Sequence, residues 1–392
     1  MLRTTRHFVA PLALAVLGLS SGIAQGQETL KIGALVTLSG AGAAWGSGML
    51  HAAELAADDV NAKGGLDVGG KKYKVQVVAY DDKYQSNEAV TVANRLVFED
   101  KVKVIIGPVG SAPVLAIQPI TEKNQVIVMT LGFTSKALGA DKPFTFRPNV
   151  TTAEVAQPQI EWVVKNRGIK KVGALFPNDE TGQQIAKDLT EAYGKTGATL
   201  AAKEFFERER VDFVPLLTRI LASKVDAIEL DGNSPQTAGL IIKQARELGF
   251  TGTVIRTGGP ATQEIVNVAG KAAAEGMFVH APIDLKLPST AAYAERYNTK
   301  YKRPMNGFSP AFYDGTNLVF EAMRKAGTVT DSVKIRNELE KIQSHDGALG
   351  KSSWTGKAVY GSNHQLDAPF YVAEVKDGQE VIRARCTVAG CK

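Results

Sequence analysis

Residues 35–49 read LVTLSGAGAAWGSGM, an apolar run that ends in glycines and leads into a helical pattern. A strand, a glycine turn and a helix in this order are typical of doubly wound α/β folds and of nucleotide-binding domains. The dinucleotide fingerprint needs a glycine three residues after Gly42, but Trp45 stands there. The turn therefore predicts either plain helix–strand packing or a ligand site that includes Trp45, because open α/β sheets bind ligands at the carboxyl ends of their strands.

The dinucleotide-binding fingerprint also requires an acidic residue, and the spacing of this sequence does not match it. It should follow the second strand about 20 residues further on. Here the second predicted strand ends at Asp81 and Asp82, roughly twice that distance away. A nucleotide-dependent enzyme is thus an alternative that the motif supports poorly.

Strand and helix patterns alternate along two successive series. Predicted strands lie at 30–38, 72–82, 102–108 and 125–130 and then, after FTFRPN (144–149), at 170–179, 198–206, 225–232 and 252–259. Helical spacing of apolar residues fills the segments between them, and the first predicted helix starts at residue 49. The alternation predicts parallel sheets with helices on both faces, and the two series predict two doubly wound lobes.

The last part of the chain, from about residue 283, is mainly helical. Its pattern has too few strands for a sheet of its own, so its helices are expected to pack back onto an existing lobe. Such a return means that the chain crosses between the lobes more than once. We expect one lobe from 28–149 plus 283–364 and the other from 150–282 plus 365–392.

The N-terminus has the three parts of a secretory signal peptide, predicted as residues 1–24. Arg3 and Arg6 precede a 12-residue apolar run, and Gly22 and Ala24 have small-x-small spacing. The run is too short to span a bilayer, and no cysteine follows it for a lipid anchor. We expect cleavage after Ala24 and export to the periplasm; a buried N-terminal helix is the alternative.

Composition and motifs exclude several functions. The net charge of +6 is scattered along 392 residues, so no nucleic-acid surface is predicted. Neither a G-x-S-x-G elbow nor an H-E-x-x-H motif occurs, and the histidines are isolated in sequence, so we expect no enzyme, metal site or cofactor. The two cysteines, Cys386 and Cys391, are expected to form a disulfide that pins the tail in an oxidising compartment.

Two further turns carry hydroxyl groups at predicted helix starts. GPVGSAPV (107–114) contains Ser111, and MTLGFTSKAL (129–138) contains Thr134 and Ser135. Backbone N–H groups and the helix dipole at such starts favour a carboxylate. The alternative is that Ser111 only caps its own helix. Neither turn has the lysine of a phosphate-binding loop.

Taken together, the chain resembles the solute-binding proteins of ABC importers of the Leu/Ile/Val type, which have the type I periplasmic binding protein fold. The resemblance covers essentially all of the mature chain. It rests on IGALVTLSGAGAAWG (32–46), AADDVNAKGG (56–65), YDD (80–82), AVTVANRLV (89–97), VIIGPVGS (104–111), FRPN (146–149) and VNVAGKAAAEGMFV (266–279). It implies two Rossmann-like lobes joined by three crossovers, closure over a small solute in the cleft, and docking on a membrane permease. A monomeric receptor is expected.

The resemblance assigns ligand contacts in the first lobe. Ser111 and Thr134 match the hydroxyls that hold the ligand's α-carboxylate, and Gly132 matches a backbone contact. Trp45 matches an aromatic wall of the pocket. The opening turn is therefore expected to approach a small solute rather than a phosphate.

Other positions depart from the family pattern but stay in the predicted site. Thr181 replaces a usual tyrosine, and Asn233 and Ser234 replace an aromatic residue. Tyr84 and Gly110 stand where the family commonly has a first-lobe disulfide, and Tyr84 joins the predicted ligand-binding set.

The position of the family's ammonium-binding acid predicts the ligand class. That acid falls at or near Gly258, beside Arg256, and Asp231 is a possible substitute. A buried ammonium needs a negative partner. We therefore expect a small carboxylate without an ammonium group, an organic or aromatic acid, to bind better than a branched-chain amino acid. An amino-acid- or amide-sensing receptor of the same fold, acting in regulation, is the alternative.

Overall fold

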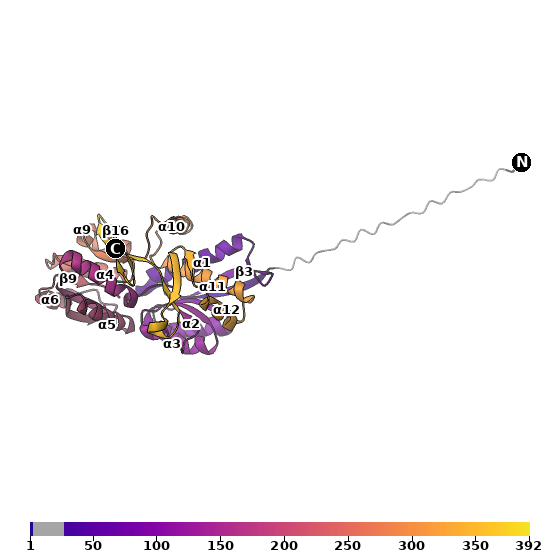
Figure 1. Cartoon of the computed structure of the whole chain (residues 1–392), viewed down its shortest axis with the longest axis horizontal. Helices are drawn as coiled ribbons and strands as arrows, with labels where there is room; N and C mark the ends of the chain where they lie inside the picture. Colours follow the sequence, from indigo (N-terminus) through magenta and orange to yellow (C-terminus); the bar gives the residue numbers. More distant parts are fainter. Residues whose placement is uncertain (3–26) are drawn as a thin grey trace.

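The computed structural model describes residues 1–2 and 27–392. The charged, apolar and cleavage parts of the predicted signal peptide lie outside the described residues. Figure 1 shows the folded chain as two bodies, with α5, α6 and β9 at one end and α2, α3 and α12 at the other. No helix in the described ranges is both long and apolar enough to cross a bilayer.

The first body is built on a six-stranded sheet in the order β2-β3-β1-β4-β5-β6. All neighbouring strands are parallel except the β2–β3 hairpin. The strands are β1 (Glu28–Val36), β2 (Leu66–Val68), β3 (Lys71–Asp81), β4 (Val104–Val109), β5 (Ile127–Leu131) and β6 (Thr145–Phe146). The helical segments are η1 (Gly40–Gly42), α1 (Ala43–Ala62), α2 (Ser86–Asn94), η2 (Arg95–Glu99), α3 (Ser111–Lys123) and η3 (Ser135–Ala137).

The second body has an eight-stranded sheet in the order β17-β16-β15-β11-β10-β9-β7-β8. It is parallel from β8 to β11 and antiparallel from β11 to β17. Its strands are β7 (Lys171–Pro177), β8 (Thr199–Phe206), β9 (Ala227–Glu229), β10 (Thr253–Arg256), β11 (Phe278–Ala281), β15 (Phe370–Lys376), β16 (Gln379–Thr387) and β17 (Gly390–Cys391). Its helices are α4 (Thr152–Arg167), α5 (Glu180–Gly194), α6 (Val214–Ala222), α7 (Pro235–Glu247), α8 (Thr262–Ala269) and α9 (Lys271–Ala274).

The chain passes between the bodies three times: after β6, after β11 and before β15. Between the second and third passages lie α10 (Pro288–Tyr301), α11 (Ser309–Ala326) and α12 (Ser332–Glu340). Of these, α11 packs against α1 and β5, as expected for a return to the first body. The predicted mixed α/β fold of two doubly wound lobes is therefore confirmed.

One expectation for this returning segment is wrong, because it does form a small sheet of its own. β12 (His345–Gly347), β13 (Gly350–Thr355) and β14 (Gln365–Asp367) are antiparallel, with α13 (Lys357–Tyr360) in the last connection. Strands this short show no clear alternation of apolar and polar residues, so the sequence pattern did not predict them. Since β14 still pairs with β13, the chain changes sheet after Asp367; the lobe boundaries stay a prediction.

The opening turn also differs from expectation, since helix α1 begins at Ala43 and not near residue 49. Gly46 lies in its first turn, pressed against the end of β1: a Cβ there would lie 1.9 Å from the backbone oxygen of Thr37. This close approach lets the helix start early despite its glycines. It places Trp45 in the first turn of α1, where it is buried.

Gly46→Ala is expected to destabilise the protein by about 2–3 kcal/mol, because the added methyl meets backbone and not a movable side chain. Urea unfolding measures the change. Gly194→Ala is the matched control: it lies at the end of α5, and a Cβ there meets no atom of the described residues within 4 Å. Alanine at 194 should be neutral or slightly stabilising. Equal effects of the two substitutions would contradict the packing argument.

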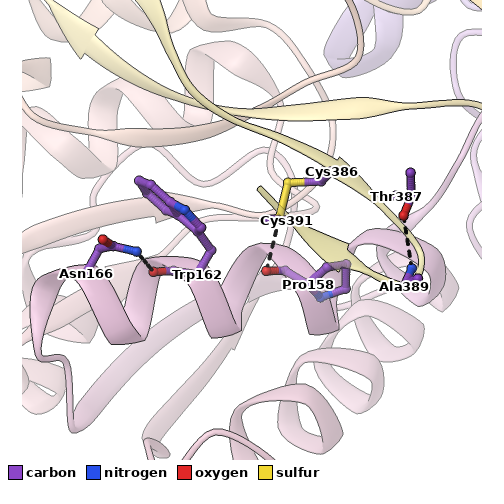
Figure 2. The surroundings of a disulfide bond; sticks show 7 residues. All are labelled: Pro158, Trp162, Asn166, Cys386, Thr387, Ala389 and Cys391. Carbon is purple, nitrogen blue, oxygen red and sulfur yellow. Dashed lines mark hydrogen bonds between the residues drawn. A yellow bond between two sulfur atoms is a disulfide. The ribbon is translucent and has the colours of Figure 1, made fainter.

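The C-terminal tail is held against helix α4 (Figure 2). A disulfide joins Cys386 of β16 to Cys391 of β17. The sulfur of Cys391 lies 3.3 Å from the carbonyl oxygen of Pro158, and Trp162 stands beside it on the same helix. The bond thus fixes the edge of the second sheet, and neither cysteine lines the cavity described next.

Candidate ligand-binding site

A cavity lies between the two bodies, where the carboxyl ends of their parallel strands face each other. In this closed arrangement its volume is ≈ 30 Å³, room for a water molecule or two. A larger solute fits only if the lobes part or the lining side chains move. The first body contributes Trp45, Tyr84, Val109, Gly110, Leu131 and Phe133, and Phe308 comes from the residue just before α11. The second body contributes Thr181, Ile185, Asp231, Gly232, Arg256 and Gly259.

Five of the nine ligand-binding residues predicted from the sequence line this cavity. They come from both bodies and are Trp45, Tyr84, Thr181, Asp231 and Arg256. The other four lie one residue from the lining: Ser111 follows Gly110, Gly132 and Thr134 flank Phe133, and Asn233 follows Gly232. These four are buried next to the cavity, and their contact with a ligand stays a prediction.

Ser111 and Thr134 are joined to each other and to the second body. Ser111 Oγ accepts a hydrogen bond from the Thr134 N–H at 2.9 Å, and the Ser111 N–H donates to Thr181 Oγ1 at 3.1 Å. The Thr134 hydroxyl donates to Glu180 Oε1 at 3.1 Å, and Lys136 Nζ holds the same oxygen at 2.9 Å. The Thr134 hydroxyl thus binds a carboxylate, but in this closed form the carboxylate belongs to the protein.

Gly132 and Asn233 form hydrogen bonds within their own lobes. The Gly132 N–H donates to Thr130 Oγ1, and its carbonyl accepts from buried Arg147 at 3.0 Å. The Asn233 amide donates to the carbonyls of Leu175 and Leu230. Both residues therefore shape the loops beside the cavity.

Arg256 brings a buried positive charge to the cavity wall. Its guanidinium is 1% exposed and donates only to carbonyl oxygens, of Gly259 at 2.7 Å, Leu230 at 3.2 Å and Asn233 at 2.8 Å. Burial lowers the pKa of Arg256, and the charge of Asp231 acts against that shift. Across residues 27–392, no carboxylate forms an ion pair with it within 4.0 Å.

Asp231 is the acidic group of the cavity. One of its oxygens accepts from the Thr152 hydroxyl at 2.5 Å and the other from the Gly232 N–H at 2.7 Å. A Cβ at Gly258 would lie 2.8 Å from Asp231 Oδ2, so this carboxylate fills the space that a side chain at 258 would take. Burial raises the pKa of Asp231, and Arg256 opposes that shift.

Behind Asp231 lies Glu229, which the sequence analysis missed. Its carboxylate accepts from the backbone of Asp231 and Thr257 and from the hydroxyls of Thr257 and Tyr193. Burial, followed by the charge of Asp231, raises the pKa of Glu229 to about 7. It ties the ends of β9 and β10 together and so fixes Asp231 relative to Arg256.

Trp45 supplies both an apolar face and a free donor. It is 7% exposed, and its indole N–H has no acceptor among the residues that the structure describes. Phe133 and Phe308 meet edge to face with ring centroids 6.2 Å apart and form another wall. A buried N–H without a partner is rare in proteins, so this donor is suited to a ligand atom.

The remaining lining residues were not predicted from the sequence. Val109 and Leu131 end two buried strands, and Phe133 lies between two residues that were predicted, so position alone could have indicated them. Phe308 precedes α11, more than 170 residues further on, and no local pattern marks it. In the described part of the chain, no three His, Cys, Asp or Glu side chains are grouped so that they could hold a metal ion.

Two α/β lobes, three crossovers and a cavity between strand ends define a clamp-like solute-binding protein. The family model described as periplasmic binding protein matches residues 29–380, and the chain belongs to this family. It is 26% identical to the Leu/Ile/Val-binding protein BraC3 of Rhizobium johnstonii, over 89% of this chain and 92% of that one. Such relatives are binding proteins and not enzymes, so the protein is a receptor for a small molecule.

Solved structures agree with the fold. The leucine-binding protein LivK of Thermotoga maritima has a TM-score of 0.81 and 25% identity, and the match covers 92% of this chain and 99% of that one. A solute-binding protein of an ABC transporter from Rhodopseudomonas palustris, in complex with 3,4-dihydroxybenzoic acid, has a TM-score of 0.77 and 24% identity over 92% and 98%. The predicted family and fold are thus confirmed, and the same fold occurs with different solutes.

Proposed function

We propose that the protein is an extracytoplasmic receptor that captures a small carboxylate-bearing solute, an organic or aromatic acid, between its lobes and delivers it to an ABC permease. Arg256 carries the proposal. Its buried guanidinium lines the cavity, and no ion pair neutralises it within the described chain. A ligand carboxylate would pair directly with this cation through a strong, charge-assisted hydrogen bond.

The rest of the cavity suits the body of such an acid. The free indole N–H of Trp45 offers a second donor, and Tyr84, Phe133 and Phe308 offer apolar faces. For Thr134 to hold the ligand as well, Glu180 must leave its hydroxyl, which separation of the lobes would allow. In this proposal Ser111, Thr134 and Gly132 line the path along which the carboxylate enters.

An amino acid is the second candidate, and Asp231 favours it. Its carboxylate fills the space beside Gly258, where the family's ammonium-binding acid is expected. The resemblance to a Leu/Ile/Val-binding protein points the same way. Against it, Asp231 already accepts two hydrogen bonds and its pKa is raised by burial, so it is a weaker partner for an ammonium group.

We also propose that the mature chain begins after Ala24 and works in the periplasm as a monomer. The periplasmic binding protein family supports the compartment. We retain lobes of 28–149 plus 283–364 and 150–282 plus 365–392, which the six-stranded and eight-stranded sheets support in outline, although β14 at Gln365–Asp367 still pairs with β13.

Calorimetry with benzoate and leucine should separate the candidates. Since leucine's ammonium lacks a well-matched acid, benzoate is expected to bind on the order of a hundredfold more tightly or better. Asp231→Asn should leave benzoate binding unchanged or improve it, because a nearby negative charge is removed. Tight leucine binding that Asp231→Asn abolishes would show that the solute is an amino acid.

A further inference from the structure

The cleft continues outside the ligand cavity as a larger groove between the lobes. The groove has a volume of ≈ 770 Å³ and takes its walls from both bodies, including Lys83 and Gln85 on one side and Arg208 and Arg210 on the other. Tyr84 lines both the groove and the cavity. Its ring therefore stands at the boundary between the buried site and the open cleft.

Arg208 of the second body is laid over this ring. Its guanidinium carbon lies 4.6 Å from the centroid of Tyr84. Nε donates to Asp179 Oδ2 at 2.5 Å, and Nη1 reaches the carbonyl of Gly232 at 3.4 Å. Asp179 is itself fixed as the cap of α5, where it accepts from the Gly182 N–H at 2.9 Å. Arg208 is thus held by its own lobe while its flat face rests on the other.

Tyr84 is held just as firmly from the first body. It has a positive φ of 62°, follows Lys83 with 53°, and both backbone N–H groups donate to the carboxylates of Asp81 and Asp82. Non-glycine residues in this region are uncommon and collect at functional sites. The ring lies on Gly110, where a Cβ would come within 2.6 Å of it. Only glycine at 110 leaves room for this packing.

A third contact closes the arrangement. The Tyr84 hydroxyl lies 3.3 Å from Thr181 Oγ1 of the second body, the same oxygen that accepts from the Ser111 N–H. The Tyr84 side chain of the first lobe therefore contacts both Arg208 and Thr181 of the second lobe. Arg208 is mostly buried, with a side chain 13% exposed, so the stacking is largely shielded from solvent.

We infer that Arg208 and Tyr84 form a latch that holds the lobes closed and separates the ligand cavity from the groove. Arg208 acts as a positioning residue, since it contacts the lining residues Tyr84 and Gly232 but does not line the cavity itself. The inference rests on the binding-protein class and holds whether the solute is an acid or an amino acid. A shielded guanidinium–aromatic pair shifts an equilibrium by about tenfold, which is the expected change in the closed-to-open ratio when it is lost.

Small-angle X-ray scattering of the mature protein tests the latch without a ligand. The protein is first unfolded, dialysed and refolded to remove bound solute. Arg208→Met, which keeps the apolar stem, and Tyr84→Leu should each give a larger radius of gyration than wild type. Arg219→Met is the matched control, because Arg219 is exposed and, within the part of the chain that the structure describes, pairs only with Glu204 of its own lobe. Its radius should stay unchanged.

The double variant decides whether the two residues act together. Arg208→Met with Tyr84→Leu should expand the protein no more than Tyr84→Leu alone, because the tyrosine change already removes the contact that Arg208 makes with the ring. Expansion by Arg208→Met alone, with Tyr84→Leu at the wild-type radius, would show that Arg208 supports only its own lobe and would overturn the inference. So would unchanged radii for both single variants.

Discussion

Replacing Arg256 by methionine should reduce benzoate binding by about 2–5 kcal/mol, or roughly thirtyfold to several thousandfold. The guanidinium is the one cation on the cavity wall among the described lining residues, and it is 1% exposed. Without it, a ligand carboxylate would enter a buried site with no opposite charge, and Asp231 nearby would repel it. Isothermal titration calorimetry measures the change.

Arg246→Met is the control for structural damage. Like Arg256, Arg246 donates to three carbonyl oxygens of the second body, those of Ala273, Phe250 and Gly252. It lies away from the cavity lining. Both variants should lose stability in urea, but only Arg256→Met should lose benzoate binding. A folded Arg256→Met protein with wild-type affinity would contradict the role that we propose for the charge.

His280→Leu should make the protein more stable in acid and change it little at pH 8. His280 is 2% exposed in β11, and neither ring nitrogen has a hydrogen-bond partner in the described chain. It faces a cavity between the crossovers, lined among others by Pro148, Pro282 and Pro369. Burial lowers its pKa to about 3.

The sign of the effect follows from proton binding. Below the ordinary histidine pKa of about 6.5, the unfolded chain binds a proton that the folded protein does not. Stability therefore falls as the pH drops from about 6.5 towards 3, by about 1.4 kcal/mol per pH unit. At pH 4.5 the loss is ~2.7 kcal/mol, which leucine would remove. Urea midpoints at pH 8 and pH 4.5 measure it.

His345→Asn should respond in the opposite direction. Burial acts to lower the pKa of His345, but Asp314 at 3.7 Å outweighs it and the pKa is raised. The charged form therefore stabilises the fold in acid, and that contribution is lost as the pH rises through the folded-state pKa. The asparagine variant should lose more stability at pH 4.5 than at pH 8. For His280, in turn, a difference in the free energy of unfolding between His280→Leu and wild type that is the same at pH 4.5 and at pH 8 would contradict the argument from proton binding.

Much of the fold could be predicted because its signals are local. Apolar runs that alternate with helical spacing predict parallel sheets, and the two series match the six-stranded and eight-stranded sheets of the structure. The errors came where local signals are weak. Helix α1 starts at Ala43 because Gly46 can touch the Thr37 backbone, and the β12–β14 sheet consists of strands too short to show a period.

The site divides in the same way. The sequence alone determined the family, the receptor class and the loops that surround the cavity, because each of these follows from residues that are neighbours along the chain. Only the tertiary structure decided that Glu180 meets Thr134, that Asp231 fills the space at Gly258 and that Phe308 closes the wall. These contacts join segments tens to hundreds of residues apart, and they depend on how two sheets face each other, which no local pattern of side chains encodes.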